Sequence, residues 1–328
     1  MNSAPTWNVT VLDDYHGVAA DIVDWGRGER SVHVRSLREH VTEEDALAEL
    51  LVDSDVIVAM RERTPLPERL LERLPRLKLI VTTGMGNSVI DRVDDIALCG
   101  TRALSSPTPE LTWALILASR RQLLSESAAL RAGRWQAAPL GAGLEGSTIG
   151  IVGLGVAGER VARIAQAFGM RVLGWSTNLT PERASEVGAE AVSKSTLFSQ
   201  SDVVSVHLRE SERTLGIVDA AAIDAMSSRA LLVNTSRAGI VDNRALGRAL
   251  RDGRLGAAAL DVFESEPLPG DADVREWPRT LLTPHLGYVT AENFELFFTD
   301  ARDAIQAFSA GAPIRLLHPQ PEPPKEEP

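Results

Sequence analysis

The sequence predicts an α/β protein built from two doubly wound parallel sheets. Short, continuously apolar segments alternate with helical patterns along most of the chain, and such strands need crossover helices on both faces of a parallel sheet. The length of 328 residues suits two domains that each bury a core. A glycine-rich module at residues 146–176 separates a first run of this alternation from a second one. These observations favour two domains over one.

The first domain is predicted from the residues before the long helix that starts at Pro107. Apolar strands are expected at Trp7–Leu12, Val32–Val34, Val56–Met60 and Leu77–Val81. Helices are expected between them at Tyr15–Trp25, Thr42–Leu51 and Pro67–Leu74. Thr42 is expected to cap the second helix, whose first turn is acidic. This order indicates an open sheet of flavodoxin-like type.

Two loops of the first domain follow strand ends, where open α/β sheets bind ligands. One loop is Arg61–Pro65 and the other is Thr82–Asn87. Gly84 and Gly86 would let backbone amides approach a ligand, and a run of amides can cradle a carboxylate. A turn without a ligand is the equal alternative on spacing alone.

A long helix is predicted at Pro107–Leu124, with proline and glutamate near its start. Its wide apolar surface favours packing between domains or against a partner subunit. The following stretch, Arg131–Gly146, is rich in glycine, alanine and proline, contains Trp135, and is interpreted as a connecting arm.

The module at 146–176 has the order strand, glycine turn, helix, strand. Strand Thr148–Val152 leads into a G-x-G-x-x-G motif at Gly153, Gly155 and Gly158, a helix runs to about Phe168, and a strand follows at Met170–Trp175. Here the first glycine allows the tight turn, the second lets backbone approach a pyrophosphate, and the third allows close helix packing. Amides at the helix start then face the phosphates. The module predicts a dinucleotide site; a glycine turn without ligand is the alternative.

The alternation resumes after the module. Strands are expected at Asp202–Leu208, Ala230–Asn234, Ala257–Val262 and Thr280–Thr283, and helices at Ala220–Met226, Asp242–Leu250 and Ala291–Phe308. Asp242 is expected to cap its helix, and Gly253 lies just past the end of that helix. The tail Pro319–Pro328 has five prolines with acidic residues, and we expect it to be disordered.

Composition excludes several function classes. The net charge of −11 argues against nucleic acid as a partner, because phosphate binding depends on lysine and arginine. No apolar run reaches the roughly 18 to 20 residues of a membrane span, and the start lacks a signal-peptide pattern. The single cysteine, Cys99, excludes an intrachain disulfide. We expect a cytoplasmic protein with no membrane contact and no metal site.

One of the six histidines stands where a reactive side chain is expected. Solvated side chains are predicted for His16, His33, His40 and His318. His207 ends a predicted strand and is interpreted as structural or cofactor-lining. His285 follows a strand end in the constrained turn Thr283-Pro284-His285, a position that presents a side chain into a crevice. Histidine is also the natural acid–base group near neutral pH.

Two further charged residues have the same placement at strand ends. Arg237 follows one apolar strand, and an arginine there can grip a carboxylate with two parallel hydrogen bonds. Glu266 follows another, and a carboxylate beside a histidine orients the ring and favours its protonated form. Either one alone reads as a surface ion-pair member. Arg237, Glu266 and His285 together predict that the ends of these strands border a single crevice.

Four sequence blocks resemble the D-isomer-specific 2-hydroxyacid dehydrogenase family. They are Gly150–Gly158, Val233–Asp242, Leu260–Pro269 and Leu282–Gly287, in the family's order. The resemblance implies that Arg237 is the catalytic arginine, Glu266 the carboxylate and His285 the acid–base histidine. It further implies that Asp261 meets the nicotinamide carboxamide and that Thr235 and His207 line the nicotinamide side.

The resemblance also implies a domain plan and a set of ligand contacts. Residues 1–105 and 288–318 would form a discontinuous substrate domain, and 106–287 a Rossmann cofactor domain through which the protein forms a homodimer. The cofactor contacts expected are Gly153, Gly155, Val156, Ala157, Gly158, Ser176, His207, Thr235, Asp261 and Gly287. The substrate contacts expected are Arg61, Gly84, Met85 and Gly86.

Departures from the family pattern leave the cofactor and the substrate open. Ser176 stands where an NAD enzyme usually carries an acidic residue for the ribose 2′-hydroxyl, yet no basic residue follows until Arg183. NAD or NADP is therefore expected, with NAD favoured by its frequency in the family. The loop 84–91 follows the family's substrate-loop pattern only loosely, and Ala238 replaces a common glycine.

The substrate expected is a small 2-keto or 2-hydroxy acid. Arg61 matches a phosphate-binding position of the family's phosphoglycerate dehydrogenases, but Glu62 departs from their pattern and their long regulatory C-terminal domain is not found. A glyoxylate or hydroxypyruvate reductase, or a broad 2-keto acid reductase, is at least as well supported. The alternative from another class is a nicotinamide-sensing, corepressor-like interaction protein on the same fold.

Overall fold

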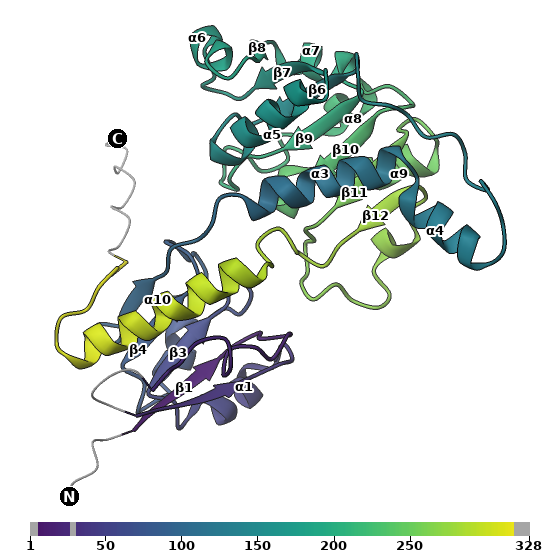
Figure 1. The fold of residues 1–328 in the computed structure, drawn as a ribbon. Coiled ribbons are helices and arrows are strands. Elements are labelled where there is room, and N and C mark those ends of the chain that lie inside the picture. Colours follow the sequence, from purple (N-terminus) through teal and green to yellow (C-terminus); the bar gives the residue numbers. More distant parts are fainter. Residues whose placement is uncertain (1–5, 27–30, 318–328) are drawn as a thin grey trace, which may run out of the picture. The chain divides into compact units, whose positions relative to one another are not determined.

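The computed structural model describes residues 6–26 and 31–317, and the chain forms two compact units (Figure 1). Unit 1 comprises the described residues up to Leu104 and those from Thr290 onward, and unit 2 comprises Ser105–Val289. The predictions for His318 and for the tail 319–328 lie outside the described residues. Both units are α/β, as predicted from the alternation of strands and helices.

Unit 1 is built on a parallel sheet of five strands within the described residues, in the order β2-β1-β3-β4-β5. The strands are β1 (Trp7–Val11), β2 (Val32–Ser36), β3 (Val56–Ala59), β4 (Leu79–Thr82) and β5 (Ala97–Gly100). Its helices are α1 (Glu44–Leu51), α2 (Glu68–Leu71) and α10 (Ala291–Ser309). Strands β3 and β4 are buried throughout, which explains why apolar residues follow one another in them instead of alternating with polar ones.

Helix α10 completes the core of unit 1 although it comes from the far end of the chain. It lies along the sheet near β4 (Figure 1). Phe297 and Phe298 are fully buried, and the Phe298 ring meets Trp25 edge-on at 6.2 Å. The predicted helix over this stretch is confirmed, and its N-terminus is capped by Thr290, whose hydroxyl accepts from the Asn293 amide.

Three sequence predictions for unit 1 are wrong or incomplete. Residues Tyr15–Trp25 form turns instead of a helix, because the Asp14 carboxylate binds the amides of Val18 and Ala19 and so competes with helical hydrogen bonds. Thr42 does not cap α1, which starts after Glu43 without a side-chain cap. Strand β5 was not predicted, since four residues are too few for a clear pattern.

Unit 2 carries a second parallel sheet, with seven strands in its described part ordered β12-β11-β10-β9-β6-β7-β8. The strands are β6 (Thr148–Val152), β7 (Arg171–Trp175), β8 (Glu190–Ala191), β9 (Val203–Val206), β10 (Leu231–Asn234), β11 (Ala257–Leu260) and β12 (Thr280–Leu282). The helices are α3 (Pro107–Arg120), α4 (Leu123–Arg131), α5 (Val156–Ala167), α6 (Pro181–Ser185), α7 (Lys194–Gln200), α8 (Ala220–Asp224) and α9 (Asn243–Arg251).

The core of unit 2 has two halves, one on each face of the sheet. Val203 belongs to the half that includes Trp113 and Val161, whereas the next residue, Val204, belongs to the half that includes Phe198. Consecutive strand residues point to opposite faces, so both faces are apolar and covered. This arrangement is the one that the continuous apolar strands predict.

The helix predicted at Pro107–Leu124 is two helices in the structure. It breaks between α3 and α4 at Gln122, whose φ of +54° is left-handed and cannot continue a right-handed helix. The cap predicted at Asp242 is confirmed, because its carboxylate accepts from the Ala245 amide. Helices α6 and α7 were not predicted, although Thr180 and Ser193 cap them in the usual way.

Candidate active site

The carboxyl ends of adjacent strands in unit 2 carry most of the predicted site residues. Thr235 and Arg237 follow β10, Asp261 follows β11, and His285 follows β12. Because these three strands are neighbours in the sheet, the residues share one sheet edge. Arg237 donates through Nη1 to the carbonyl oxygen of Ser236 at 2.8 Å, which ties its side chain to this edge.

His285 and Glu266 form a direct pair. The Nδ1 atom of His285 lies 2.6 Å from Oε2 of Glu266, and the two side chains are only 17% and 19% exposed. The other Glu266 oxygen, Oε1, accepts from the Phe263 amide at 3.0 Å, so the carboxylate itself is fixed. Since Nδ1 is used by Glu266, a proton exchanged with a ligand has to be carried by Nε2.

Asp261 holds the turn that presents His285. Its buried carboxylate accepts from the Thr283 hydroxyl at 2.6 Å and from the amides of Leu286 and Gly287 at 2.7 and 2.8 Å. Burial raises the pKa of Asp261, while these hydrogen bonds act in the opposite direction. His285 has a left-handed φ of +53°, which this bonded turn maintains. The structure therefore shows a structural role for Asp261 within unit 2.

Thr235 and His207 are both embedded in the neighbouring part of the sheet edge. The hydroxyls of Thr235 and Thr112 are 2.8 Å apart, and Nε2 of His207 is 2.8 Å from the Ser205 hydroxyl. Nδ1 of His207 is enclosed and has no hydrogen-bond partner in the described part of the chain. Burial lowers the pKa of His207 to about 4, so this histidine is neutral near pH 7.

The glycine-rich turn requires glycine at two of the three positions of its motif. Gly153 has φ +101°, and a Cβ there would lie 2.8 Å from the His207 carbonyl oxygen. At Gly158 a Cβ would lie 2.0 Å from the Gly153 carbonyl oxygen, so only glycine allows the helix to pack this closely against the turn. Gly155 instead borders open space, and α5 begins there without a side-chain cap.

The start of α5 offers hydrogen-bond donors to an anion. Within residues 6–26 and 31–317, the N–H groups of Val156 and Ala157 have no acceptor. Uncapped N–H groups at a helix start, together with the open backbone at Gly155, fit a dinucleotide phosphate. Residues Gly153–Gly158 would hold that phosphate.

The position that would distinguish NAD from NADP carries no decisive charge. Ser176 follows the end of β7 and is neutral. Arg183, the next basic residue, pairs with Glu159 and also donates to Glu186 at 2.6 Å. Its guanidinium is thus already balanced by two carboxylates. The structure gives neither a carboxylate for a 2′-hydroxyl nor an uncommitted arginine for a 2′-phosphate at these positions.

The predicted substrate loop lies in unit 1, at the carboxyl ends of β3 and β4. Gly84 has φ +118°, and a Cβ there would lie 2.6 Å from Nη1 of Arg61. Arg61 donates through the same Nη1 to the Thr83 carbonyl oxygen at 3.3 Å. Asn87 closes the loop by donating to the Arg61 carbonyl oxygen at 2.6 Å. The structure therefore brings Arg61 and the glycine loop together.

The prediction for His40 is wrong, and its partner Asp13 was missed. Nδ1 of His40 lies 2.8 Å from Oδ1 of Asp13, and the histidine side chain is only 11% exposed. Asp13 also accepts from the hydroxyls of Thr64 at 2.6 Å and Tyr15 at 3.2 Å. An aspartate directly after an apolar strand was the sequence signal for this buried cluster. His16 and His33 are exposed, as predicted.

The described residues contain neither a cluster of metal-binding side chains nor a membrane-spanning helix. Nowhere in residues 6–26 and 31–317 do three or more histidine, cysteine, aspartate or glutamate side chains form a group that could hold a metal ion. None of the helices described is long and apolar enough to cross a membrane.

Comparison with known proteins identifies the family. The pattern of the D-isomer specific 2-hydroxyacid dehydrogenase NAD binding domain matches residues 113–287. The chain belongs to this family. It is 34% identical to a glyoxylate reductase of Thermococcus litoralis over 270 residues, which cover 78% of each chain. The resemblance inferred from four short blocks is thereby confirmed, and with it an NAD-binding oxidoreductase of this family.

Other relatives show how far the similarity extends. A D-3-phosphoglycerate dehydrogenase of Mycobacterium leprae is 34% identical over 77% of this chain, but the match spans only 49% of that relative's length. A crystal structure of a phosphoglycerate oxidoreductase from Vibrio cholerae has a TM-score of 0.86 and 36% identity, covering 93% of this chain and 100% of the other. The two-sheet α/β fold of this 2-hydroxyacid dehydrogenase is therefore that of its family.

Proposed function

We propose that this dehydrogenase transfers a hydride between NAD(P)H and a small 2-keto acid to give a D-2-hydroxy acid, with His285 as the general acid and base. The observation that carries the proposal is the 2.6 Å contact between His285 Nδ1 and Glu266 at the carboxyl edge of the cofactor-type sheet. A carboxylate in this position stabilises the imidazolium and fixes which nitrogen faces the substrate.

Each residue has a defined part in the proposed reaction. The nicotinamide, when bound, supplies or takes the hydride. Protonated His285 gives its Nε2 proton to the keto oxygen during reduction and takes it back during oxidation. Glu266 keeps the ring oriented, and Arg237 binds the carboxylate and carbonyl of the substrate. The amides of Met85 and Gly86 are proposed to bind the same carboxylate.

The two units are proposed to divide the ligands between them. Residues 106–287 would bind the cofactor and residues 1–105 with 288–318 the substrate. The match of residues 113–287 to an NAD binding domain supports the proposal that residues 106–287 bind the cofactor. The cofactor contacts proposed are Gly153, Gly155, Val156, Ala157, Gly158, Ser176, His207, Thr235, Asp261 and Gly287. Both NAD and NADP stay possible at Ser176, and NAD is favoured by its frequency in the family.

Glyoxylate, hydroxypyruvate or a range of 2-keto acids are the proposed substrates. Two relatives that this chain covers well are named glyoxylate reductase, and the match to phosphoglycerate dehydrogenases spans only about half of their length. Arg61, held against the glycine loop, is proposed to meet the substrate tail. These proposed substrates need not carry a phosphate group.

We also propose a homodimer formed through the cofactor domain. Large apolar side chains are exposed on α4 and on the arm that follows it: Trp135 is 78% exposed, and Leu140 fully so. Leu123, Leu124 and Leu130 of α4 are more than half exposed as well. An apolar surface of this kind indicates a protein partner. Size-exclusion chromatography with light scattering should give twice the mass of 35.4 kDa.

A substrate panel tests the proposed activity. Oxidation of NADH and of NADPH is followed spectrophotometrically with glyoxylate, hydroxypyruvate, pyruvate and phenylpyruvate. Turnover with at least one of these acids is expected, and the same assay decides which cofactor is preferred. Tight cofactor binding without turnover on any 2-keto acid would instead favour the corepressor-like alternative.

A further inference from the structure

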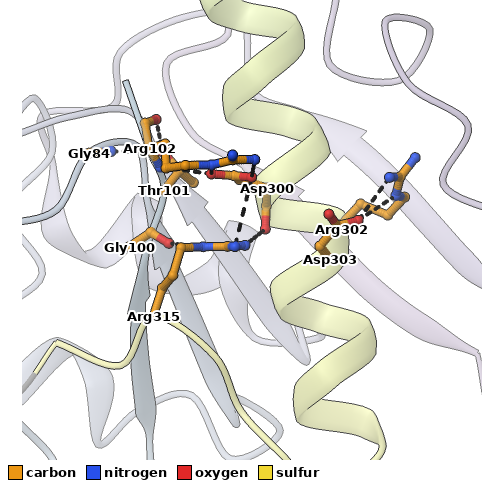
Figure 2. Close-up of polar contacts among 8 residues, drawn as sticks. All are labelled: Gly84, Gly100, Thr101, Arg102, Asp300, Arg302, Asp303 and Arg315. Carbon is orange, nitrogen blue, oxygen red and sulfur yellow. Dashed lines mark hydrogen bonds and ion pairs between the residues drawn. The ribbon is translucent and has the colours of Figure 1, made fainter. Parts of the chain in front are cut away.

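Thr101 engages both backbone polar groups of Gly84. The Gly84 amide donates to Oγ1 of Thr101 at 2.9 Å, and the Thr101 amide donates to the Gly84 carbonyl oxygen at 3.1 Å. Thr101 is fully buried, directly after β5, and Figure 2 shows it beside Gly84. The preceding residue has to be glycine, since a Cβ on Gly100 would lie 2.6 Å from the Gly84 carbonyl oxygen. The two peptide units on either side of the Gly84 Cα are thus each held by one hydrogen bond to Thr101.

The Thr101 hydroxyl is itself oriented by the next peptide. Oγ1 donates to the Arg102 carbonyl oxygen at 3.0 Å, so its hydrogen is committed and a lone pair faces the Gly84 amide. The Arg102 peptide is held in turn by Asp300, whose Oδ2 accepts from the Arg102 amide at 2.8 Å. Asp300 stands on α10, 198 residues further along the chain.

Asp300 is a buried anchor between two arginines. Its side chain is fully buried, and it accepts from Nε and Nη2 of Arg102 at 3.1 and 2.7 Å (Figure 2). Nη1 of Arg315 lies 3.8 Å from Oδ1, and Nε of Arg315 donates to the Gly100 carbonyl oxygen at 3.1 Å. Burial acts to raise the pKa of Asp300, but the bonds from Arg102 and the charges of both arginines outweigh it and lower the pKa. Asp300 is therefore ionised at neutral pH.

This arrangement decides which loop amides can bind a ligand. The N–H of Gly84 is used by Thr101, whereas those of Met85 and Gly86 have no acceptor among the residues that the structure describes. We propose that Thr101 is a positioning residue that fixes the Gly84 peptide so that the Met85 and Gly86 amides are aimed at the substrate carboxylate. Asp300 anchors Thr101 through Arg102. The inference rests on the proposed function of this loop.

Substitution of Thr101 separates positioning from chemistry. Thr101→Val keeps the shape and removes the hydroxyl, so KM for the best 2-keto acid should rise about tenfold, the effect of losing roughly one buried hydrogen bond. kcat should change less than threefold, and the Kd for NADH should not change. Thr101→Ser keeps the hydroxyl and should restore KM to within about twofold. A merely structural role would impair all three parameters together, with a lower kcat, a higher KM and a higher Kd for NADH.

Calorimetric titration of oxamate, a 2-keto acid analogue, into the enzyme–NADH complex measures the same contact without turnover. Thr101→Val should weaken oxamate roughly tenfold, and Asp300→Asn should weaken it at least threefold. If circular dichroism shows that Thr101→Val does not fold, the oxamate affinities of Asp300→Asn and Thr101→Ser test the inference instead. Unchanged KM and oxamate affinity in folded variants would overturn the inference.

The same experiments separate this inference from the proposed function. If His285→Ala keeps full turnover while Thr101→Val still weakens oxamate, the acid–base proposal fails and the positioning role stands. If His285→Ala is inactive and Thr101→Val binds oxamate normally, the positioning role fails alone. Absence of oxamate binding to the unaltered enzyme overturns the positioning role, whereas the substrate panel decides the proposed activity separately.

Discussion

The edge of the unit 2 sheet and the edge of the unit 1 sheet present the proposed functional groups in different ways. In unit 2 the group is a side chain, His285, and it is held by the carboxylates of Glu266 and Asp261. In unit 1 the groups are backbone amides, and they are held by the hydroxyl of Thr101 and the side chain of Asn87. Proton transfer needs a titrating side chain, whereas binding a carboxylate needs only correctly aimed N–H groups.

This contrast predicts a division of kinetic effects between the two edges. Changes at the unit 2 edge should act mainly on kcat, because they alter proton transfer, and changes at the unit 1 edge mainly on KM. Three substitutions test this division, and a fourth tests stability.

The largest effect is expected for His285→Ala. Removal of the general acid should lower kcat about 10³-fold, within the range measured for this kind of catalysis, while the Kd for NADH stays within about twofold. Steady-state kinetics and fluorescence titration measure the two quantities. An unchanged kcat would show that His285 is not the general acid. The proposed division of kinetic effects between the two sheet edges would then be wrong.

The second prediction concerns how the stability of the protein depends on pH through the buried His207. Because burial lowers the pKa of His207 to about 4, the folded protein binds fewer protons than the unfolded one between pH 4 and 6.5. The free energy of unfolding should therefore fall as pH decreases from 6.5 to 4, by at most about 3 kcal/mol. His207→Gln should flatten this part of the profile in urea unfolding. A variant with the same slope as the unaltered protein would contradict the assignment.

The third prediction separates the charge of Glu266 from its shape. Glu266→Gln keeps a hydrogen bond to His285 but removes the negative charge that stabilises the imidazolium, so kcat should fall roughly 10²-fold, with KM nearly constant. Equal changes in kcat and KM would mean that Glu266 shapes the substrate site instead.

The smallest effect is expected in unit 1, at Gly84. Alanine there is strained at φ +118° and meets Arg61, so Gly84→Ala should raise KM about tenfold with little change in kcat. Gly270→Ala is the matched control, since a Cβ there has no atom within 4 Å. If Gly84→Ala lowered kcat as strongly as Glu266→Gln, the proposed division between the two edges would be wrong.

Local patterns in the sequence were enough to predict most of the fold and the types of the candidate residues. The strand at Thr148–Val152 and the cap at Asp242 depend on residues within a few positions of one another. Asp242 was predicted as a cap from its sequence neighbours alone. Arg237, Glu266 and His285 were found because each directly follows an apolar strand or its loop.

What the sequence did not reveal depends on partners far along the chain. Asp13 meets His40, 27 residues away, and Arg102 meets Asp300, 198 residues away. No periodicity relates such pairs, so His40 was assigned to solvent and Thr101 was overlooked. The predicted helix at Tyr15–Trp25 failed for a related reason, because the Asp14 side chain replaced helical hydrogen bonds with local ones.

The 198 residues between Arg102 and Asp300 also set the order in which the two units can mature on a ribosome. Unit 2 is continuous in the sequence, so it can fold once Val289 has been synthesised. The core of unit 1 can form completely only after Phe297 and Phe298 of α10 have been synthesised. At roughly 5–20 residues per second, the 198 residues between Arg102 and Asp300 take about 10–40 s to synthesise. Until then the apolar surface of unit 1 that Phe297 and Phe298 cover in the finished fold is without its partner helix.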